Sequence, residues 1–182
     1  MKQEIIIAGF GGQGVLMMGK ILAYSGLMDD KEVTWMPSYG PEQRGGTANV
    51  TVILSDDRIS SPVLDSYDIV VALNQQSIDK FASRVKSGGI LIYDSNGIHN
   101  PPKRTDISTI PIDVMEATFK IGNPRAYNMI VLGALLEAME YKLPMENVAK
   151  GLKKSLPERH HHLIPLNRDA IEIGRSLISS EN

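Results

Sequence analysis

The amino-acid sequence predicts a doubly wound α/β fold with a mostly parallel sheet, on three observations. Short apolar runs rich in β-branched residues recur along the chain, which is typical of buried strands. Segments with helical periodicity alternate with these runs, and such alternation is typical of βαβ units around a parallel sheet. A glycine-rich turn joins the first apolar run to the first helical segment, as in a Rossmann-like first βαβ unit.

The first part of the chain is predicted to hold three strands and one helix. An isoleucine-rich run at 4–8 forms the first strand and ends in glycines, and a helix follows from about 13 to 26. Strands are also expected at 33–36 and 48–54. They flank a loop at 37–46 that is rich in glycine, proline and polar residues.

The second part is predicted to complete the sheet and then to become helical. Residues 68–73 form a buried strand, followed by a helix at 77–86 with Ser77 as its N-cap. A strand at 90–93 comes next, and 107–112 is expected at an edge of the sheet, because a proline within it cannot donate to a central ladder. Helices are expected at about 125–141, 145–156 and 165–178.

The composition is that of an ordinary globular protein and narrows the classes of function. The chain has 182 residues, 42% of them hydrophobic and 22% charged, with a net charge of −2. We therefore predict a single α/β domain over 1–182, with about 125–182 mainly helical. This balance argues against a nucleic-acid partner, and no apolar run approaches the about 20 residues that a membrane span requires. No signal peptide precedes the first strand, so we expect a cytoplasmic protein.

The chain is expected to hold no metal and no catalytic residue of its own. It has no cysteine, which excludes disulfides, thiolate-bound iron–sulfur clusters and zinc–thiolate sites within it. Consecutive residues on a helix point in different directions, so His160-His161-His162 is more consistent with a surface connection than with a chelate. The stretch from Gly14 to Lys20 resembles a Walker A motif, but Ile21 supplies no hydroxyl for magnesium, and we interpret these residues as core.

The glycine turn after the first strand is the first candidate binding site. Gly9, Gly11 and Gly14 match the spacing of the dinucleotide-binding fingerprint, between a strand and a helix. The amides of a helix N-terminus suit an anion, and Gln13 would add a neutral donor. The alternative is a tight turn that binds nothing. The second strand ends without the acid that would bind a ribose hydroxyl, which argues against a standard NAD site but not against another phosphate ligand.

The loop at 37–46 is the second candidate site. It concentrates hydroxyls, a carboxylate, a guanidinium and three glycines in one connection, at strand ends where open α/β sheets bind ligands. Arg44 could clamp a phosphate or carboxylate, and Glu42 could orient Arg44 or contact a partner chain. A solvated loop with an exposed Glu–Arg pair is the alternative, and residue chemistry alone does not separate ligand contact from subunit contact.

The two loops together resemble the gamma subunit, or gamma domain, of the 2-oxoacid:ferredoxin oxidoreductases. The resemblance runs from Gly9 to Val15 and from Val33 to Asn49, and is also evident at Ser61-Pro62 and from Asp68 to Phe81. The second loop is the more specific of the two. The sequence of this loop is closest to the 2-oxoglutarate branch of the family. The pyruvate, branched-chain and indolepyruvate members share the fold and the glycine turn.

The resemblance implies a non-catalytic gamma subunit in a multi-subunit complex of anaerobic metabolism. In that family a 2-oxoacid and coenzyme A yield acyl-CoA and carbon dioxide, and electrons pass to ferredoxin. Thiamine diphosphate, Mg and iron–sulfur clusters would lie on the alpha and beta subunits and on a ferredoxin-like delta subunit where the enzyme has one. The family's gamma domain lies beside the coenzyme A site, so the candidate ligand contacts are Gly9, Gly11, Gly12, Gln13, Gly14, Ser38, Tyr39, Gly40, Glu42, Arg44, Gly45 and Gly46. The competing hypothesis is a stand-alone NAD(P)- or nucleotide-binding protein.

Overall fold

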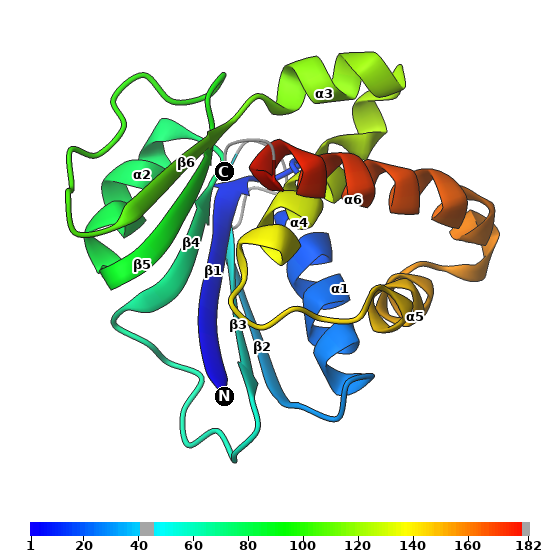
Figure 1. The fold of residues 1–182 in the computed structure, drawn as a ribbon, viewed down its shortest axis with the longest axis horizontal. Coiled ribbons are helices and arrows are strands. Elements are labelled where there is room, and N and C mark those ends of the chain that lie inside the picture. Colours follow the sequence, from blue (N-terminus) through cyan, green and yellow to red (C-terminus); the bar gives the residue numbers. More distant parts are fainter. Residues whose placement is uncertain (41–45, 180–182) are drawn as a thin grey trace.

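A six-stranded sheet forms the centre of the protein in the computed structural model, which describes residues 1–40 and 46–179 (Figure 1). Its strand order is β2-β3-β1-β4-β5-β6. Strand β3 runs antiparallel to both neighbours, and the pairings from β1 across to β6 are parallel. The strands are β1 (Lys2–Phe10), β2 (Glu32–Tyr39), β3 (Thr47–Ser55), β4 (Tyr67–Ala72), β5 (Val85–Asp94) and β6 (Ser108–Ile112).

Helices cover both faces of this sheet, as the predicted doubly wound fold requires (Figure 1). Helices α1, α4, α5 and α6 lie on one face, and α2 lies on the other. The α-helices are α1 (Val15–Leu27), α2 (Gln75–Phe81), α3 (Val114–Ile121), α4 (Tyr127–Ala138), α5 (Met145–Ser155) and α6 (Ile164–Ser179). Three short 3₁₀ helices are η1 (Ala82–Arg84), η2 (Pro124–Ala126) and η3 (Glu158–Leu163). None of the described helices is long and apolar enough to cross a bilayer.

Strand β1 is buried on both faces, which explains its unbroken apolar sequence. Ile5 and Ile7 belong to the hydrophobic cluster under α1 and α4, whereas Ile6 and Ala8 belong to the cluster under α2. Successive side chains of a strand point to opposite faces, so a central strand with helices on both sides needs apolar residues at every position. This is the pattern from which the strand was predicted.

The first βαβ unit differs from a standard Rossmann unit in one respect. Strand β3 lies between β1 and β2, so the two strands joined by α1 are not neighbours. Phe10 at the end of β1 is opposite Thr47, and Tyr39 at the end of β2 is opposite Ala48. The connection from β2 to β3 therefore begins and ends at the same edge of the sheet as the glycine turn.

Two helical predictions need correction. Asn74, not Ser77, caps α2, because the Asn74 side chain accepts a hydrogen bond of 2.8 Å from the Ser77 amide. Helix α3 was not predicted at all. It is short, its N-cap is Asp113 and it ends at Gly122 in a left-handed conformation. Val114 and Ala117 are buried, but Met115 and Phe119 are exposed, so apolar residues lie on both sides of the helix and hide its buried side in the sequence.

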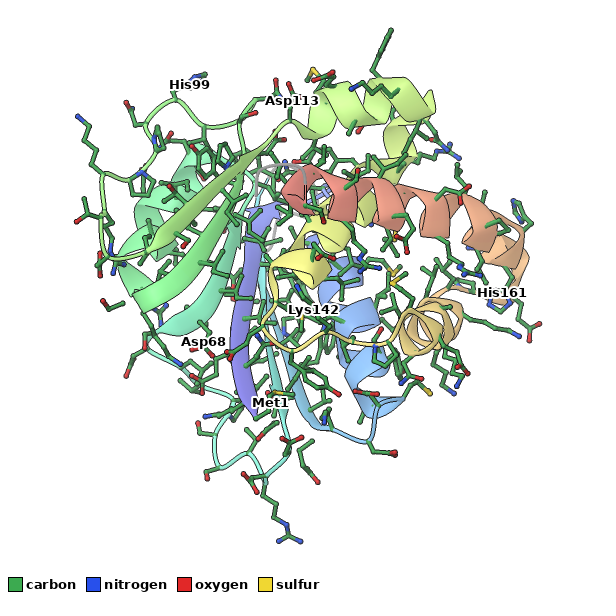
Figure 2. The ribbon with its side chains drawn as sticks, in the orientation of Figure 1. Met1, Asp68, His99, Asp113, Lys142 and His161 are labelled. Carbon is green, nitrogen blue, oxygen red and sulfur yellow. The ribbon has the colours of Figure 1, made fainter. Side chains whose placement is uncertain are left out.

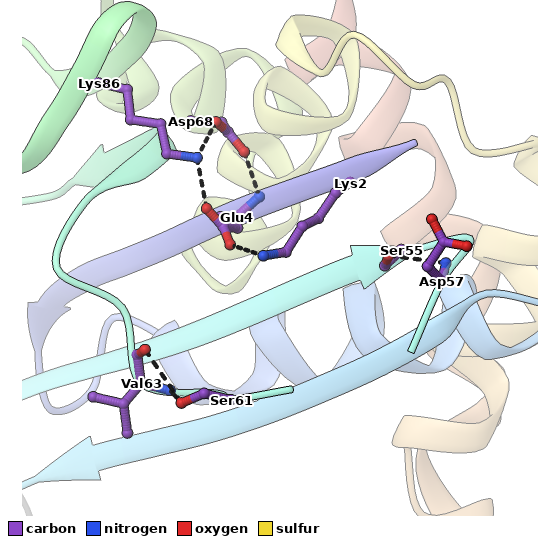
Figure 3. A network of polar contacts seen from close by, with 8 residues as sticks. All are labelled: Lys2, Glu4, Ser55, Asp57, Ser61, Val63, Asp68 and Lys86. Atoms are coloured by element: carbon purple, nitrogen blue, oxygen red, sulfur yellow. Dashed lines mark hydrogen bonds and ion pairs between the residues drawn. The ribbon is translucent and has the colours of Figure 1, made fainter. Parts of the chain in front are cut away.

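The amino-terminal edge of the sheet carries a closed network of charges (Figure 3). Lys86 Nζ lies 2.5 Å from Glu4 Oε2 and 2.6 Å from Asp68 Oδ1, and Lys2 pairs with the other oxygen of Glu4. Asp68 also accepts a hydrogen bond of 2.8 Å from the Glu4 amide. Each of these charged groups is partnered, so the network joins the first residues of β1, β4 and β5.

Candidate functional site

The glycine turn connects β1 to α1 through backbone conformations that favour glycine. Gly12 and Gly14 have φ angles of 106° and 74°, in the left-handed region where a Cβ is costly. Gly9 meets a different requirement, since a Cβ there would lie 2.5 Å from Gln13 Oε1 and 3.2 Å from Leu73 Cβ. The predicted turn is thus present, with glycines that serve both chain reversal and close packing.

The beginning of α1 has no side-chain cap. Gly14 is the N-cap residue and the first turn has no acidic residue. The first amides of a helix have no intrahelical partner, and they carry the positive end of the helix dipole. In this helix the Met18 amide is the first to bond back, to the Gly14 carbonyl at 3.0 Å. The turn therefore offers main-chain donors at the place predicted for an anion.

Gln13 has an internal role that the sequence did not reveal. Its Oε1 accepts a hydrogen bond of 2.6 Å from the Phe10 amide, and its Nε2 donates to the Leu73 carbonyl at 3.3 Å. The side chain thus ties the turn to the end of β4. It is not the free donor that the sequence led us to expect beside a ligand.

The two candidate loops meet at the carboxyl edge of the sheet. The Gly11 amide donates to the Gly46 carbonyl at 2.8 Å, and the Gly40 amide donates to the Thr47 carbonyl at 3.3 Å. The prediction that the second loop lies at strand ends is confirmed for the residues that flank it. Its predicted bounds of 37–46 are wrong at the beginning, because Pro37, Ser38 and Tyr39 pair with β3 and belong to β2. Glu42, Arg44 and Gly45 lie outside the described residues.

A cleft of about 430 Å³ opens between these two loops and the start of α1. Of the predicted site residues, it brings together Gly11, Gly12, Gly14, Tyr39 and Gly46. Ser38 and Gly40 lie next to it without lining it, and Gly9 lies beneath the turn. Apolar side chains form much of its wall, and its described lining is Phe10, Gly11, Gly12, Gly14, Val15, Leu16, Met17, Tyr39, Gly46, Thr47 and Ala48.

A second cleft, of about 460 Å³, lies between the glycine turn and the segment that leads into α4. Arg125 and Asn128 line it, and neither was singled out from the sequence. Asn128 packs over the turn so closely that a Cβ on Gly14 would lie 2.5 Å from its Nδ2. Because the clefts share Gly12 and Gly14, the turn lies between them, and the second cleft also contains the polar side chains of Arg125 and Asn128.

A hydrogen-bonded pair of a half-buried tyrosine and a buried aspartate lies beside the second cleft, where β5 ends. Tyr127 donates a hydrogen bond of 2.7 Å to Asp94 Oδ2, and Asp94 is only 6% exposed. Burial, and then the charge of Asp94, raises the pKa of the Tyr127 hydroxyl well above its usual value, so this group stays protonated. Tyr127 and Gln13 both line the second cleft. Asp94 directly follows the predicted strand at 90–93, and its place at the end of a parallel strand is the signal that could have identified it.

The topology adds a reason against a standard dinucleotide site. In that site the acid for the ribose ends the strand next to β1, at the carboxyl edge. Here the strand in that position is β3, which is antiparallel and therefore ends at the opposite edge. Strand β2, which does end at the carboxyl edge, finishes at Tyr39, so the sequence-based argument against NAD and the fold agree.

The fold and the site together define an α/β domain with a Rossmann-like glycine turn and a hairpin loop beside it. Residues 4–177 match the family model described as pyruvate ferredoxin/flavodoxin oxidoreductase, and the chain belongs to this family. The predicted gamma-type resemblance is thereby confirmed at the level of the family.

This chain is similar in sequence to relatives whose names give different substrates. It is 42% identical over 171 residues to ketoisovalerate oxidoreductase subunit VorA of Methanothermobacter marburgensis, covering 94% of this chain but 35% of the relative. It is 35% identical over 162 residues to 2-oxoglutarate synthase subunit KorC of Methanocaldococcus jannaschii, covering 87% of this chain and 86% of the relative. The chain thus spans about a third of VorA, at 35%, and most of KorC.

Two solved structures share the fold along nearly the whole chain. The gamma subunit of a keto/oxoacid ferredoxin oxidoreductase from Geobacter sulfurreducens has a TM-score of 0.84 at 28% identity, covering 99% of this chain and 98% of that one. The 2-oxoglutarate:ferredoxin oxidoreductase from Magnetococcus marinus, with 2-oxoglutarate, coenzyme A and succinyl-CoA bound, has a TM-score of 0.87 at 23% identity. It is covered over 31% of its length, against 98% of this chain, and this likeness concerns the fold alone.

Proposed function

We propose that this chain is the non-catalytic gamma subunit of a 2-oxoacid:ferredoxin oxidoreductase and that its two loops form one wall of the coenzyme A site. The complex would convert a 2-oxoacid and coenzyme A to acyl-CoA and carbon dioxide, passing electrons to ferredoxin. The observation that carries the proposal is the junction of the loops. The hydrogen bond from Gly11 to Gly46 joins the two loops, and both residues line the cleft beside the start of α1.

The chemistry of the cleft suits the parts of coenzyme A. A diphosphate is stabilised by main-chain amides and by the positive end of a helix dipole. The long arm of coenzyme A, which has both polar and apolar parts, suits a cleft whose walls include Phe10, Met17 and Tyr39. Tyr39 is 68% exposed, so it is available to contact a ligand or a neighbouring subunit. Arg44 would supply a guanidinium to a phosphate from the loop that borders this cleft.

The redox groups would belong to partner chains. The sequence has no cysteine for an iron–sulfur cluster, and no Gly-Asp-Gly stretch of the kind that holds magnesium and the diphosphate of thiamine diphosphate. We therefore propose alpha and beta subunits as carriers of thiamine diphosphate and Mg, with clusters there or on a delta subunit. In the VorA relatives the matching segment makes up 35% of a longer chain, so in those proteins a similar segment is joined to further sequence.

We propose 2-oxoglutarate as the substrate, with a branched-chain 2-oxoacid as the second candidate. The match with KorC of Methanothermobacter marburgensis extends over 98% of this chain and 97% of the relative, at 35% identity. The higher identity of 42% to VorA favours the branched-chain acid. The test is to purify the complex from the native host, identify the copurifying chains and assay it with 2-oxoglutarate, ketoisovalerate, pyruvate and indolepyruvate. The acid that is oxidised preferentially is the substrate. Preferential oxidation of another acid would overturn the substrate assignment.

A matched pair of glycine variants tests the coenzyme A site in the assembled enzyme. Gly12 and Gly88 both have positive φ, 106° and 79°, and a Cβ at either would meet nothing within 4 Å. Gly12→Ala and Gly88→Ala therefore carry a similar backbone cost of about 1 kcal/mol, but only the first adds a methyl group to the clefts. We expect Gly12→Ala alone to raise the KM for coenzyme A, about threefold or more. Equal KM values in both variants would remove the turn from the site.

A further inference from the structure

We infer that a groove between α1 and β2 is the surface on which the subunit that carries thiamine diphosphate docks. The inference rests on the function proposed above and names the face of this chain through which that subunit reaches the coenzyme A cleft. The observation that carries it is a line of apolar side chains that stays exposed beside the edge strand β2 and leads into the cleft.

The groove lies where one side of α1 passes β2 (Figure 1). The helix approaches the strand closely, since a Cβ on Gly26 would lie 3.1 Å from Val33 Cγ2. A hollow of about 260 Å³ remains between the later turns of α1 and the first half of β2. This hollow defines the α1–β2 groove, and its lining is Lys20, Ala23, Tyr24, Leu27, Val33 and Trp35.

The α1–β2 groove follows the same line as the coenzyme A cleft of about 430 Å³. Leu16 lines that cleft and precedes Lys20 by one helical turn, so the two residues lie on one side of α1. Tyr39 also lines the cleft and is four positions from Trp35, so the two share one face of β2. A protein that covers the groove therefore also reaches the cleft.

Apolar exposure is concentrated along this line. Eight large apolar side chains are exposed among the described residues, and half of them lie in the groove, at its end or in the adjoining cleft: Leu27, Met28, Trp35 and Tyr39. Exposed apolar groups that gather in this way mark interaction sites, and tryptophan, tyrosine and methionine are enriched in the centres of interfaces.

The free edge of β2 is not suited to a further strand. The Gly40 amide donates to the Thr47 carbonyl at 3.3 Å, so every second residue of β2 before Gly40 turns its main chain toward β3. The alternate residues, among them Trp35 and Pro37, turn theirs to the free edge. Pro37 has no amide hydrogen and interrupts the row of donors there. The groove is therefore expected to bind through side chains, which disfavours a second copy of this chain paired strand to strand.

The position of the groove selects the subunit with thiamine diphosphate as its occupant. Acyl transfer to coenzyme A needs that cofactor beside the cleft, so its subunit has to cover the end of the groove at Tyr39. In the VorA relatives the segment that matches this chain makes up 35% of a longer chain, so a similar domain has further sequence of the same protein beside it.

The lining of the groove defines the chemistry of the segment that it accepts. Lys20 is the one charged residue in the described lining, and it forms no ion pair with any described residue. Its Nζ lies 6.0 Å from the centroid of the Tyr24 ring. We therefore expect the docking segment to present apolar side chains and one carboxylate over Lys20.

The absence of cysteine from this chain allows a direct test by thiol labelling. Leu27→Cys places one thiol in the groove, at a residue that is 51% exposed, and Val63→Cys is the control at a residue that is 69% exposed. Val63 lies near Met1, which marks the lower, amino-terminal edge of the sheet in Figure 2. We expect N-ethylmaleimide to label Leu27→Cys about tenfold or more slowly in the assembled oxidoreductase than in the free chain, as read by the mass of this chain. Val63→Cys should react equally in both, and equal rates for Leu27→Cys would overturn the inference.

Trp35→Lys tests how strongly the same surface contributes to assembly. Loss of an aromatic anchor should raise the dissociation constant between this chain and its partner subunits about tenfold or more, while Val63→Lys should leave it unchanged. Thermal unfolding of the free variants would show that each is folded. Lys20→Glu should weaken assembly more than Lys20→Gln, because only the first opposes a carboxylate. A native dissociation constant in folded Trp35→Lys would contradict the inference.

The remaining outcomes separate this inference from the proposed coenzyme A site. Normal assembly of Trp35→Lys, with a raised KM for coenzyme A in Gly12→Ala, would remove the docking surface and leave the site intact. Weakened assembly of Trp35→Lys, with a native KM in Gly12→Ala, would remove the site and support the docking surface. A free chain that is dimeric, and that Trp35→Lys makes monomeric without affecting assembly, would assign the groove to a second copy and refute the inference.

Discussion

The two edges of the sheet differ in how their polar groups are satisfied. At the amino edge Lys2, Glu4, Asp68 and Lys86 neutralise one another in the network of Figure 3. At the carboxyl edge no side chain of the described residues caps the start of α1, and the first turn of α1 has no acidic residue. Groups that are satisfied internally stabilise a fold, while donors left without a partner beside a cleft are available to a ligand. The contrast among the described residues supports the proposal that the carboxyl edge is the one that binds coenzyme A.

Gly14→Ala is expected to have the largest effect, and it tests whether the carboxyl edge of the sheet binds the ligand. Gly14 has a φ of 74°, and the new methyl group would lie 2.5 Å from Asn128 Nδ2. Strain and overpacking should together cost about 2–3 kcal/mol of folding free energy and raise the KM for coenzyme A at least tenfold. Thermal unfolding and steady-state kinetics of the assembled enzyme would measure both effects. A wild-type KM in this variant would contradict a ligand role for the carboxyl edge.

Arg44→Ala should have the next largest effect. A charge-assisted hydrogen bond to a phosphate contributes about 1.5–3 kcal/mol, so we expect the KM for coenzyme A to rise about tenfold or more. Arg58→Ala is the control, since Arg58 is an exposed arginine close to Met1 and Lys2 at the amino edge. An unchanged KM with normal assembly would remove Arg44 from the site.

At the amino edge, Glu4→Gln should change stability and leave coenzyme A kinetics alone. Glu4 is 6% exposed and contacts two lysines, of which Lys86 has a side chain 37% exposed. Solvent screening of that lysine reduces the expected loss to about 1–2 kcal/mol of unfolding free energy. Denaturant unfolding would measure it. A raised KM for coenzyme A in this variant would contradict the separation of roles between the two edges.

The smallest predicted effect is a loss of folding stability at low pH. Burial acts to raise the pKa of Glu4, but hydrogen bonds from Lys2 and Lys86 outweigh it, and the pKa is lowered. Lys31, followed by the terminal ammonium, lowers the pKa of Asp56 to about 2. Both groups contribute stability that is present above their unfolded pKa values and is lost as pH falls through the lowered ones. Between pH 5 and pH 2, near those pKa values, the free energy of unfolding should depend less on pH in Asp56→Asn than in the native protein. Equal slopes would contradict this prediction.

Local patterns were sufficient to predict most of the sheet and the position of the glycine turn. The isoleucine run of β1 and the glycines after it are consequences of burial and backbone angle, which adjacent residues record. The place of β3 was not predictable in this way, because a long loop permits either a crossover or a hairpin. The Asp94–Tyr127 bond joins residues 33 positions apart, and no spacing rule connects them. Helix α3 was missed because its exposed Met115 and Phe119 obscure the helical periodicity.

The antiparallel insertion of β3 has a consequence for protein engineering. The strands on either side of residues 40–46 belong to one ladder, in which Tyr39 pairs with Ala48 and Ser38 with Asn49. The segment can therefore be exchanged as a cassette between relatives while the register of the hairpin is kept. Chimeras built in this way would show whether preference for one 2-oxoacid travels with the transplanted segment or stays with the partner chains.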